Sequence, residues 1–253
     1  MLAGILIDLS GVLYVSEKPV EGAIDAINRI RSTGLPVRYV TNTTRSPATQ
    51  IITKLNVMGF SIEVGELYTA PMAAYDYIVR HQLSPYLLIH PALKDELDFS
   101  LTEHPDAVFI GDAENDFTYE NMNRAFRILK KGATLIGMGK NRYFQEQDGL
   151  SIDAGAFLTA LEYAAETKAV ILGKPSVEFF MSAMQSIDCK PENTVMIGDD
   201  VESDVNGAIR AGLSGILVQT GKYRPGDEKK IIQGNGVCLS DINAVADWVI
   251  ELV

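Results

Sequence analysis

The sequence predicts an α/β protein with a doubly wound parallel sheet and a smaller α/β domain inserted into it. Short apolar runs rich in Val, Ile and Leu alternate along the chain with stretches that have a 3.6-residue apolar period. Such alternation is typical of parallel strands joined by crossover helices. The chain of 253 residues is long enough for one large domain that carries an insert.

The expected strands are short and end at polar or turn residues. They are Gly4–Asp8, Pro36–Thr41, Tyr86–His90, Ala107–Gly111, Thr134–Met138, Ala169–Gly173, Thr194–Gly198 and Gly215–Gln219. Three helices are clearest between and after them. The first begins at Ser46 and Pro47, which suit the N-cap and N1 positions. The apolar stripes of the three are Ile51, Leu55 and Met58; Met122, Ala125, Phe126 and Leu129; and Ile242, Val245, Ala246 and Val249.

The distribution of reactive groups suggests where the insert lies. The chemically suggestive strand ends fall near the two ends of the sequence, while the middle has strands and helices but no comparable cluster. Insertions succeed at loops on the active face of a domain. We therefore expect a Rossmann-like core at 1–74 plus 169–253 and an inserted α/β domain at 75–168.

Composition narrows the class of protein. Hydrophobic residues are 47% and charged residues 22%, and no apolar run approaches the ~20 residues that span a bilayer. The start, MLAGILIDLS, has no basic segment, and Cys189 and Cys238 lack CxxC spacing, so we expect free thiols in the cytoplasm. The net charge of -11 argues against nucleic acid or an anionic membrane as partner. An anionic substrate would need a locally positive site or a metal.

Four strand ends carry groups that suit phosphoryl transfer. They are ILIDLSG, VRYVTNTT, VILGKPS and VMIGDDVESD. Each alone is more often a solvated turn or a helix cap. Together they supply a nucleophile, a phosphate-binding hydroxyl, a cation and a metal ligand at one edge of a sheet.

The order DLSGVL, TN, GKP and GDDxxxD resembles the haloacid dehalogenase superfamily of aspartyl-nucleophile phosphatases. The central insert resembles the large α/β cap, of type IIA, that lies between the second and third motifs in one subfamily. Phrases such as GKPSVEFF, VMIGDD and TGKYRPGDE resemble the branch that acts on phospholysine, phosphohistidine and inorganic pyrophosphate. The resemblance covers essentially the whole chain and implies an enzyme, a phosphatase.

The resemblance implies Asp8 as the nucleophile that forms an aspartyl-phosphate. Two carboxylates and a phosphate dianion cannot share a site without a cation, so Mg²⁺ is expected. The resemblance places it on the carboxylates of Asp8 and Asp199 and on the backbone carbonyl of Ser10. Asp200 would support the metal, and Asp204 would orient the cationic lysine or a metal water. A helix-start acid is an equally good interpretation of Asp204.

The remaining implied contacts hold the phosphate. Thr41, with the backbone of Asn42, would bind a phosphate oxygen, and Lys174 would place a fixed positive charge where the transition state spreads its negative charge. Lys140 and Arg142 in the insert could contact an anionic leaving group, although such a loop is more often solvated. Arg45, Gly221, Lys222 and Arg224 are weaker candidates of the same kind.

Ser10 stands where many members of this superfamily have a second Asp, which protonates the leaving group. A serine hydroxyl is too weak an acid or base for that role near neutral pH. We therefore expect small phosphorylated substrates with good leaving groups, namely pyrophosphate or phosphoramidates. The alternatives are a catalytically weakened phosphate-binding or scaffold protein and, less readily, a receiver domain. The sequence leaves the physiological substrate and the oligomeric state open, with a homodimer as one option.

Overall fold

The computed structural model describes residues 1–99, 102–145 and 148–253, and the chain divides into two compact units. The core unit comprises Met1–Thr41, Ala48–Tyr68 and Lys174–Val253. The inserted unit comprises Asn42–Pro47 and Thr69–Gly173. The chain therefore first leaves the core unit after Thr41 and finally re-enters it at Lys174. The sequence singles out both residues.

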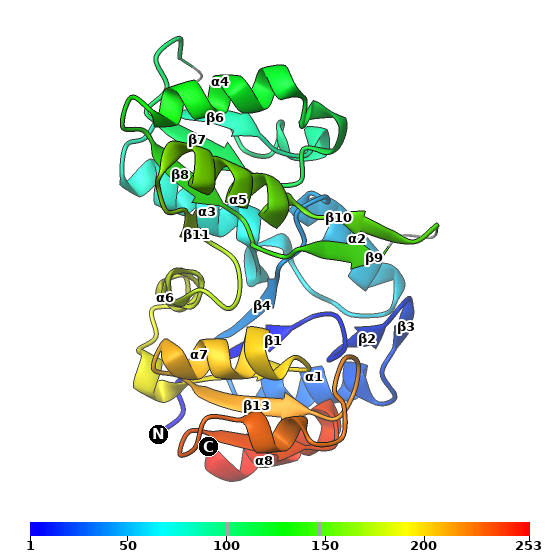
Figure 1. The fold of residues 1–253 in the computed structure, drawn as a ribbon. Helices are drawn as coiled ribbons and strands as arrows, with labels where there is room; N and C mark the ends of the chain where they lie inside the picture. Colours follow the sequence, from blue (N-terminus) through cyan, green and yellow to red (C-terminus); the bar gives the residue numbers. More distant parts are fainter. Residues whose placement is uncertain (100–101, 146–147) are drawn as a thin grey trace. The chain divides into compact units, whose positions relative to one another are not determined.

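The core unit is built on a six-stranded sheet in the order β14-β13-β12-β1-β4-β5 (Figure 1). Its strands are β1 (Gly4–Asp8), β4 (Val37–Thr41), β5 (Leu67–Thr69), β12 (Thr194–Gly198), β13 (Ser214–Val218) and β14 (Gly236–Leu239). The pairs from β14 through β4 run parallel. All five residues of β1 and of β12 are buried, as expected for central strands covered on both faces.

Helices cover the two faces of this sheet. Ile5 and Ile7 of β1 point into one core with α1, α2 and α8, while Leu217 of β13 packs on the opposite side with Val205. This alternation follows from the period of two along a strand. The helices of the core unit are α1 (Ala23–Ser32), α2 (Ala48–Val57), α6 (Val177–Gln185), α7 (Gly207–Arg210) and α8 (Ile242–Leu252), with a π-helix, η5 (Val201–Asn206), before α7.

Short elements complete the core unit. A two-stranded sheet follows the β1 turn, formed by β2 (Tyr14–Val15) and β3 (Lys18–Pro19). Three 3-10 helices lie in loops: η1 (Val64–Glu66), η4 (Pro191–Asn193) and η6 (Asp227–Lys230). The last of these forms at a run of four charged residues, DEKK.

The inserted unit has its own parallel sheet, in the order β11-β8-β7-β6. Helices α4 and α5 pack on one face around Val108 and Ile110 of β7, whereas Phe109 contacts Phe99 on the other, and Phe99 contacts Tyr75 of α3. Its elements are α3 (Ala70–Arg80), β6 (Pro85–Leu88), η2 (Pro91–Leu93), β7 (Ala107–Ile110), η3 (Glu114–Asp116), α4 (Tyr119–Leu129), β8 (Thr134–Gly137), a hairpin of β9 (Tyr143–Gln145) and β10 (Leu150–Ile152), α5 (Ala154–Ala165) and β11 (Val170–Ile171).

The predicted α/β fold, with a parallel core sheet and an inserted α/β unit, is confirmed. The differences are local. Helix α2 starts at Ala48, so Pro47 precedes the helix and does not occupy N1. The edge strands β5 (LYT) and β14 (GVCL) are absent from the sequence prediction.

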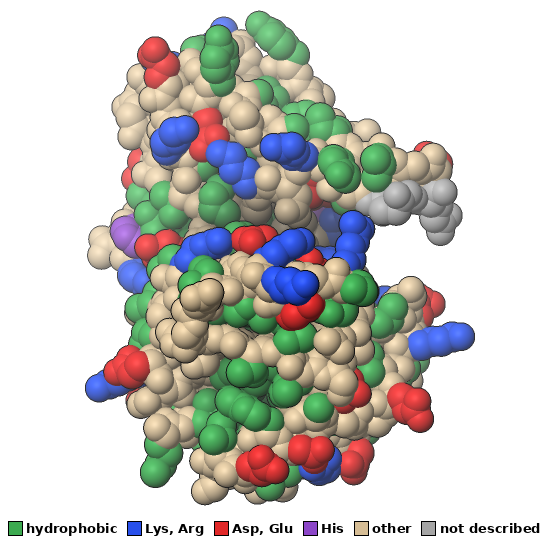
Figure 2. Space-filling view, turned by 60° about the horizontal axis from the view of Figure 1, so that its bottom comes forward, with side chains coloured by type: hydrophobic (Ala, Val, Ile, Leu, Met, Phe, Trp, Pro, Cys, Tyr) green, Lys and Arg blue, Asp and Glu red, His purple; other side chains and the backbone are tan. Residues whose placement is uncertain are grey.

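Two surface properties bear on the class of protein. Within the described residues, no helix is both long and apolar enough to cross a membrane. On the face that Figure 2 shows, acidic and basic side chains are interspersed among hydrophobic ones.

Candidate active site

The register of the central strands brings three predicted residues together. Strand β1 lies between β12 and β4, with Ile7 paired to Ile197 and Asp8 paired to Val40. All three strands are parallel, so their carboxyl ends meet at one edge. Asp8 ends β1, Thr41 ends β4, and Asp199 directly follows β12. All three are buried.

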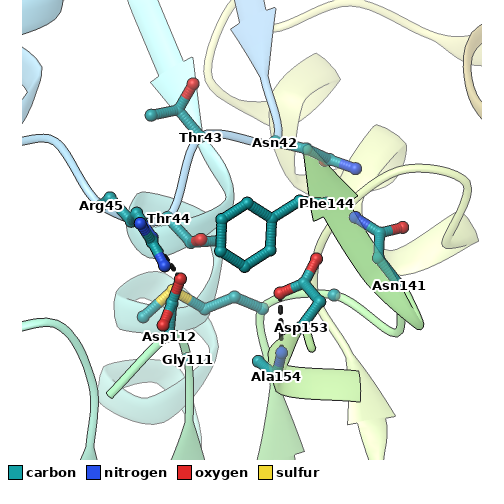
Figure 3. Close-up of a pocket in the computed structure, with 12 residues that line it drawn as sticks. Asn42, Thr43, Thr44, Arg45, Gly111, Asp112, Asn141, Phe144, Asp153 and Ala154 are labelled. Carbon is teal, nitrogen blue, oxygen red and sulfur yellow. Dashed lines mark hydrogen bonds and ion pairs between the residues drawn. The ribbon is translucent and has the colours of Figure 1, made fainter. Parts of the chain in front are cut away.

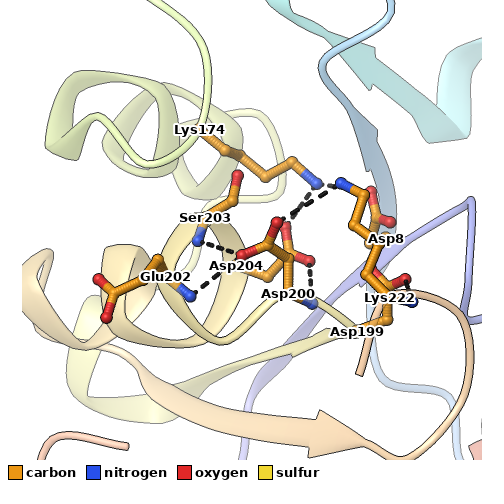
Figure 4. A network of polar contacts seen from close by, with 8 residues as sticks. All are labelled: Asp8, Lys174, Asp199, Asp200, Glu202, Ser203, Asp204 and Lys222. Carbon is orange, nitrogen blue, oxygen red and sulfur yellow. Dashed lines mark hydrogen bonds and ion pairs between the residues drawn. The ribbon is translucent and has the colours of Figure 1, made fainter. Parts of the chain in front are cut away.

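Lys174 reaches two of the carboxylates, those of Asp8 and Asp204 (Figure 4). Its Nζ is 2.5 Å from Asp8 Oδ1 and 2.7 Å from Asp204 Oδ1. The side chain of Lys174 is only 4% exposed, so this ammonium is almost fully removed from water. A buried charge of this kind persists only when it is paired and hydrogen-bonded. Lys174 therefore pairs directly with Asp8, a contact that the sequence analysis did not predict.

The carboxyl and amino groups shift one another's pKa. Burial raises the pKa of Asp8 to about 7, against the opposing effect of Lys174 and with a further increase from Asp204. Burial also raises the pKa of Asp199 to about 6, although the N–H of Lys222 counteracts it. Burial alone would lower the pKa of Lys174, but Asp204 and Asp8 raise it well above its ordinary value. Lys174 is thus charged, and Asp8 and Asp199 bind protons more readily than ordinary aspartates do.

Asp199 has one oxygen occupied and one without a partner. Its Oδ2 accepts a hydrogen bond of 2.7 Å from the backbone N–H of Lys222. Its Oδ1 is buried and has no hydrogen-bond partner among the described residues. An orphaned carboxylate oxygen in a buried site is costly unless a cation or a water satisfies it.

The residues present fit a divalent cation. Ligand atoms of Asp8, Asp199 and Asp204 all lie within 4.8 Å of one another, and all three residues are buried. Hard oxygen donors of this kind suit Mg²⁺. The Oδ2 of Asp204 accepts from the N–H of Asp200, and its Oδ1, which like Asp199 Oδ1 has no hydrogen-bond partner among the described residues, lies 2.7 Å from Lys174 Nζ in an ion pair. Asp8 and Asp199 are therefore better placed to bind the ion than Asp204.

Asp200 and Asp204 have separate roles in the structure. The Oδ1 of Asp200 accepts hydrogen bonds from the N–H groups of Glu202 and Ser203, so Asp200 is the N-cap of η5. The sequence suggested a role near the metal for Asp200 and missed this cap. Asp204 lies in the first turn of η5 and contacts Lys174 directly, so its position is compatible with both interpretations that the sequence left open.

Ser10 and Asn42 are more exposed than Asp8, Lys174, Asp199 and Asp204, which are buried. Ser10 is exposed in the turn after β1, where it forms an isolated bridge with Tyr14. Asn42 directly follows Thr41, and its side chain lines a pocket of about 230 Å³ within the inserted unit (Figure 3). The same pocket contains Phe144, Asp112 and Asp153. The backbone of Asn42, which the sequence proposes as a phosphate donor, is one peptide away from Thr41.

The cationic candidates of the inserted unit have partners of their own. The Nζ of Lys140 is 2.5 Å from Glu162 Oε2, while Arg142 is exposed. Arg45 is paired with Asp112 and lies over the ring of Phe144. These contacts give Lys140 and Arg45 a structural role within the inserted unit, which the sequence pattern alone could not reveal.

Two glycines and one backbone amide also contribute to the site. Gly11 has φ +89° and Gly221 has φ +62°, and a Cβ on either would overlap Asp199 Oδ2. The hydroxyl of Thr220 donates to the carbonyl of Gly11. The sequence identified Gly221 and Lys222 only as weak candidates. Their position just past β13, beside the strand that carries Asp199, was the available signal.

Two family models match separate parts of the chain. A model described as haloacid dehalogenase-like hydrolase matches residues 5–100, and one described as HAD-hydrolase-like matches residues 171–244. Together they include the ends of β1, β4 and β12 and Lys174.

Curated relatives are similar over most of their length. The "Haloacid dehalogenase-like hydrolase domain-containing protein 2" of Bos taurus is 44% identical over 230 residues, covering 91% of this chain and 89% of that protein. The "Phospholysine phosphohistidine inorganic pyrophosphate phosphatase" of Xenopus laevis is 45% identical over 233 residues, covering 89% and 86%. The crystal structure of a 4-nitrophenylphosphatase from Thermotoga maritima has a TM-score of 0.87 at 23% identity, covering 98% of this chain and 97% of that one. The last comparison speaks for the fold alone.

Proposed function

We propose a mechanism for this chain, which belongs to the haloacid dehalogenase-like hydrolase family and is a phosphatase. In it, the protein hydrolyses small phosphorylated substrates with Mg²⁺ through an aspartyl-phosphate on Asp8. The observation that carries the proposal is the contact of one buried lysine, Lys174, with Asp8 and Asp204, beside the orphaned oxygen of Asp199. This combination of a carboxylate nucleophile, a fixed cation and a metal-binding oxygen is what phosphoryl transfer requires.

In the first step, a carboxylate oxygen of Asp8 attacks phosphorus as the bond from phosphorus to the leaving group breaks. The leaving group takes the bonding electron pair. Lys174 contacts Asp8 Oδ1, so we assign the attack to Oδ2. The hydroxyl of Thr41 and the backbone of Asn42 would hold a phosphate oxygen, and Lys174 would oppose the charge that develops on the phosphoryl group.

In the second step, water attacks the phosphorus of the aspartyl-phosphate, the bond to the Asp8 oxygen breaks, and phosphate leaves. Bound Mg²⁺ would neutralise charge on the phosphoryl oxygens throughout. Asp8, Asp199 and the carbonyl of Ser10 would hold it. Asp204 would keep Lys174 in place by its ion pair of 2.7 Å.

The proposed substrates have leaving groups that need no proton from the enzyme. Pyrophosphate leaves as a stabilised phosphate, and the nitrogen of a phosphoramidate can leave already protonated. Ser10 offers no acid for an alkoxide leaving group. The relative from Xenopus laevis carries phospholysine, phosphohistidine and inorganic pyrophosphate in its name, which supports the same substrate class here.

Replacing Asp8 by Asn tests the proposal. The side chain keeps its shape but loses the nucleophilic charge, so release of phosphate from pyrophosphate with Mg²⁺ should fall to background. Asp25→Asn, an exposed change in α1, serves as the control and should keep the parental rate. If Asp8→Asn retains near-parental turnover on pyrophosphate, phosphohistidine and p-nitrophenyl phosphate, the aspartyl-phosphate mechanism is wrong. A parent with no turnover on any of them would favour the phosphate-binding alternative.

A further inference from the structure

The Oδ2 atom of Asp199 is enclosed by backbone from two different loops (Figure 4 shows Asp199 and Lys222). Gly11, in the turn after β1, approaches it so closely that a Cβ would overlap it. Gly221, in the loop after β13, approaches it equally closely. The N–H of Lys222 donates to the same oxygen at 2.7 Å. These contacts need glycine at both positions, because each has a positive φ as well as no room for a side chain.

The two loops are joined to each other. The hydroxyl of Thr220 donates to the carbonyl of Gly11, and a Cβ on Gly221 would also overlap the Cα of Gly11. All of these residues belong to the core unit, and β13 is hydrogen-bonded to β12, the strand that carries Asp199. The segment Thr220–Lys222 is thus fixed against the turn after β1, and the N–H of Lys222 points at Asp199 Oδ2.

The other oxygen, Oδ1, is buried and has no hydrogen-bond partner among the described residues. The N–H of Lys222 holds Oδ2 and two glycines lie close to it, so Oδ1 is the oxygen that is available to a cation. Mg²⁺ accepts this, because it takes six ligands at short distance in near-ideal octahedral geometry. Ca²⁺ takes six to eight ligands and often binds a carboxylate through both oxygens.

We propose that the segment Thr220–Lys222 is a positioning element that restricts Asp199 to ligation through Oδ1 and thereby makes the site prefer Mg²⁺ over Ca²⁺. The inference rests on the proposed function only in taking the buried carboxylates as a divalent cation site. It assigns a role to residues that do not themselves touch the ion. Removing the restraint frees Oδ2. Asp199 is then held less precisely as a ligand of Mg²⁺, whereas Ca²⁺ gains a second oxygen.

The test measures ion binding by calorimetry in the absence of substrate. Thr220→Val removes the hydroxyl that ties the segment to Gly11, and Gly221→Ala pushes the segment away from Asp199. Partners behind the ligands are typically worth about 10–100-fold in metal affinity. We expect Mg²⁺ to bind about tenfold more weakly in both variants while the affinity for Ca²⁺ changes less, so the ratio Kd(Mg²⁺)/Kd(Ca²⁺) rises.

Matched controls separate this effect from general destabilisation. Thr53→Val also loses a hydroxyl-to-carbonyl hydrogen bond, but on α2, and Gly34→Ala places alanine at a φ of +75° with open space around it. Both should keep the parental ratio. Thr220→Ser keeps the hydroxyl and should keep the ratio too. If Gly221→Ala does not fold by near-ultraviolet circular dichroism, Thr220→Val and its serine counterpart carry the test.

The outcomes distinguish this inference from the proposed function. An unchanged ratio in Thr220→Val, or an equal loss of both ions, would overturn the positioning role even if the parent hydrolyses pyrophosphate with Mg²⁺. If Thr220→Val raises the ratio but the parent has no hydrolytic activity, the positioning role is supported and the proposed function is overturned. A parent that binds neither ion would overturn both.

Discussion

Asp8, Asp199, Asp204 and Lys174 form a site with excess negative charge. When ionised, three carboxylates and one ammonium give −3 + 1 = −2, and all four side chains are buried. Protonation removes part of this negative charge, since burial raises the pKa of Asp8 to about 7 and that of Asp199 to about 6. A divalent cation would cancel the charge without protonating the nucleophile. This is the physical reason to expect a metal here.

Asp204→Asn tests how Lys174 is positioned. Asparagine retains the shape but removes one of the two charges that hold the ammonium, so Lys174 should bind the transferring phosphoryl group less accurately. We expect kcat on pyrophosphate to fall about 10–100-fold, as for other groups that orient a ligand of the site. KM should change less. Asp227→Asn, which breaks the exposed pair with Lys230, is the control. A parental kcat in Asp204→Asn would remove Asp204 from the mechanism.

Ser10→Asp tests the explanation of the substrate class. If Ser10 is tolerated because the leaving groups need no proton, a carboxyl group at this exposed turn should help alkyl phosphate monoesters selectively. Positioned acid–base catalysis is worth about 10²–10⁴-fold. The ratio of kcat/KM for glycerol phosphate to that for pyrophosphate should rise, because any loss common to both cancels. Ser16→Asp adds the same charge in the turn between β2 and β3 and should leave the ratio flat. A flat or falling ratio in Ser10→Asp would contradict our explanation.

At the scale of the element, the sequence indicated the candidate site where side chains follow parallel strands. Asp8, Thr41 and Asp199 could be placed together because the carboxyl ends of β1, β4 and β12 meet at one edge, whatever the detailed loops. Lys174 could be assigned to the same edge by its motif, GKP. Polar residues at the ends of buried strands therefore locate the site from the sequence alone.

The contacts that the sequence could not predict are made by backbone or by local exceptions to regular structure. The N–H of Lys222 binds Asp199, and no side-chain pattern encodes a backbone donor. Asp204 contacts Lys174 from a π-helix, η5. The sequence offered this contact as one of two interpretations of Asp204 but could not choose between them, because a π-helix departs from the 3.6-residue period. The pair of Lys140 with Glu162 depends on the meeting of a loop and α5, which are 22 positions apart.

A buried carboxylate, that of Glu162, links helix α5 to two neighbouring segments. Glu162 accepts hydrogen bonds from Lys140 Nζ at 2.5 Å and from the N–H of Ala169 at 3.0 Å. Burial alone would raise the pKa of Glu162, but the N–H of Ala169 and Lys140 together lower it below its ordinary value. The charged form is therefore stabilised by folding, and this contribution exists above the ordinary pKa and is lost as pH falls through the lowered one.

Glu162→Gln should accordingly destabilise the protein by about 1.5–3 kcal/mol at pH 7, the range for hydrogen bonds to a charged group. The difference in unfolding free energy from the parent should shrink as pH falls below about 4.5, the ordinary glutamate value. Denaturant unfolding at several pH values measures it. Glu166→Gln removes the exposed partner of Lys130 and should cost little at any pH. A penalty for Glu162→Gln that does not depend on pH would contradict the role of the charge.

At the scale of the whole molecule, the chain consists of two units with separate sheets and separate hydrophobic cores. The acidic cluster and Lys174 belong to the core unit, while the pocket with Asn42 and Phe144 belongs to the inserted unit. Two single peptide links, Thr41–Asn42 and Gly173–Lys174, connect residues of the proposed phosphate site to the inserted unit. Thr41 and Lys174 are therefore each joined by one peptide bond to a residue of the inserted unit.

The boundary of the inserted unit can be tested with two fragments, 69–173 and the sequence-predicted 75–168. Both have about 100 residues, a size at which domains fold alone. The shorter one begins inside α3, so it lacks the N-cap Thr69 and the buried Ala70, Ala73 and Ala74. It also lacks Ala169, the partner of Glu162, and the edge strand β11 (Val170–Ile171).

We expect fragment 69–173 to unfold cooperatively on heating and to give dispersed amide resonances. Fragment 75–168 should melt at a clearly lower temperature or lack a cooperative transition, because it exposes the apolar surface that the first turn of α3 and β11 cover. Fragment 69–168 separates the two causes, since it restores α3 but not β11. Its stability should fall between the other two. Equal melting temperatures for all three would mean that neither the start of α3 nor β11 belongs to the folding unit, and the sequence-predicted limits of 75–168 would then be the better description of the inserted domain.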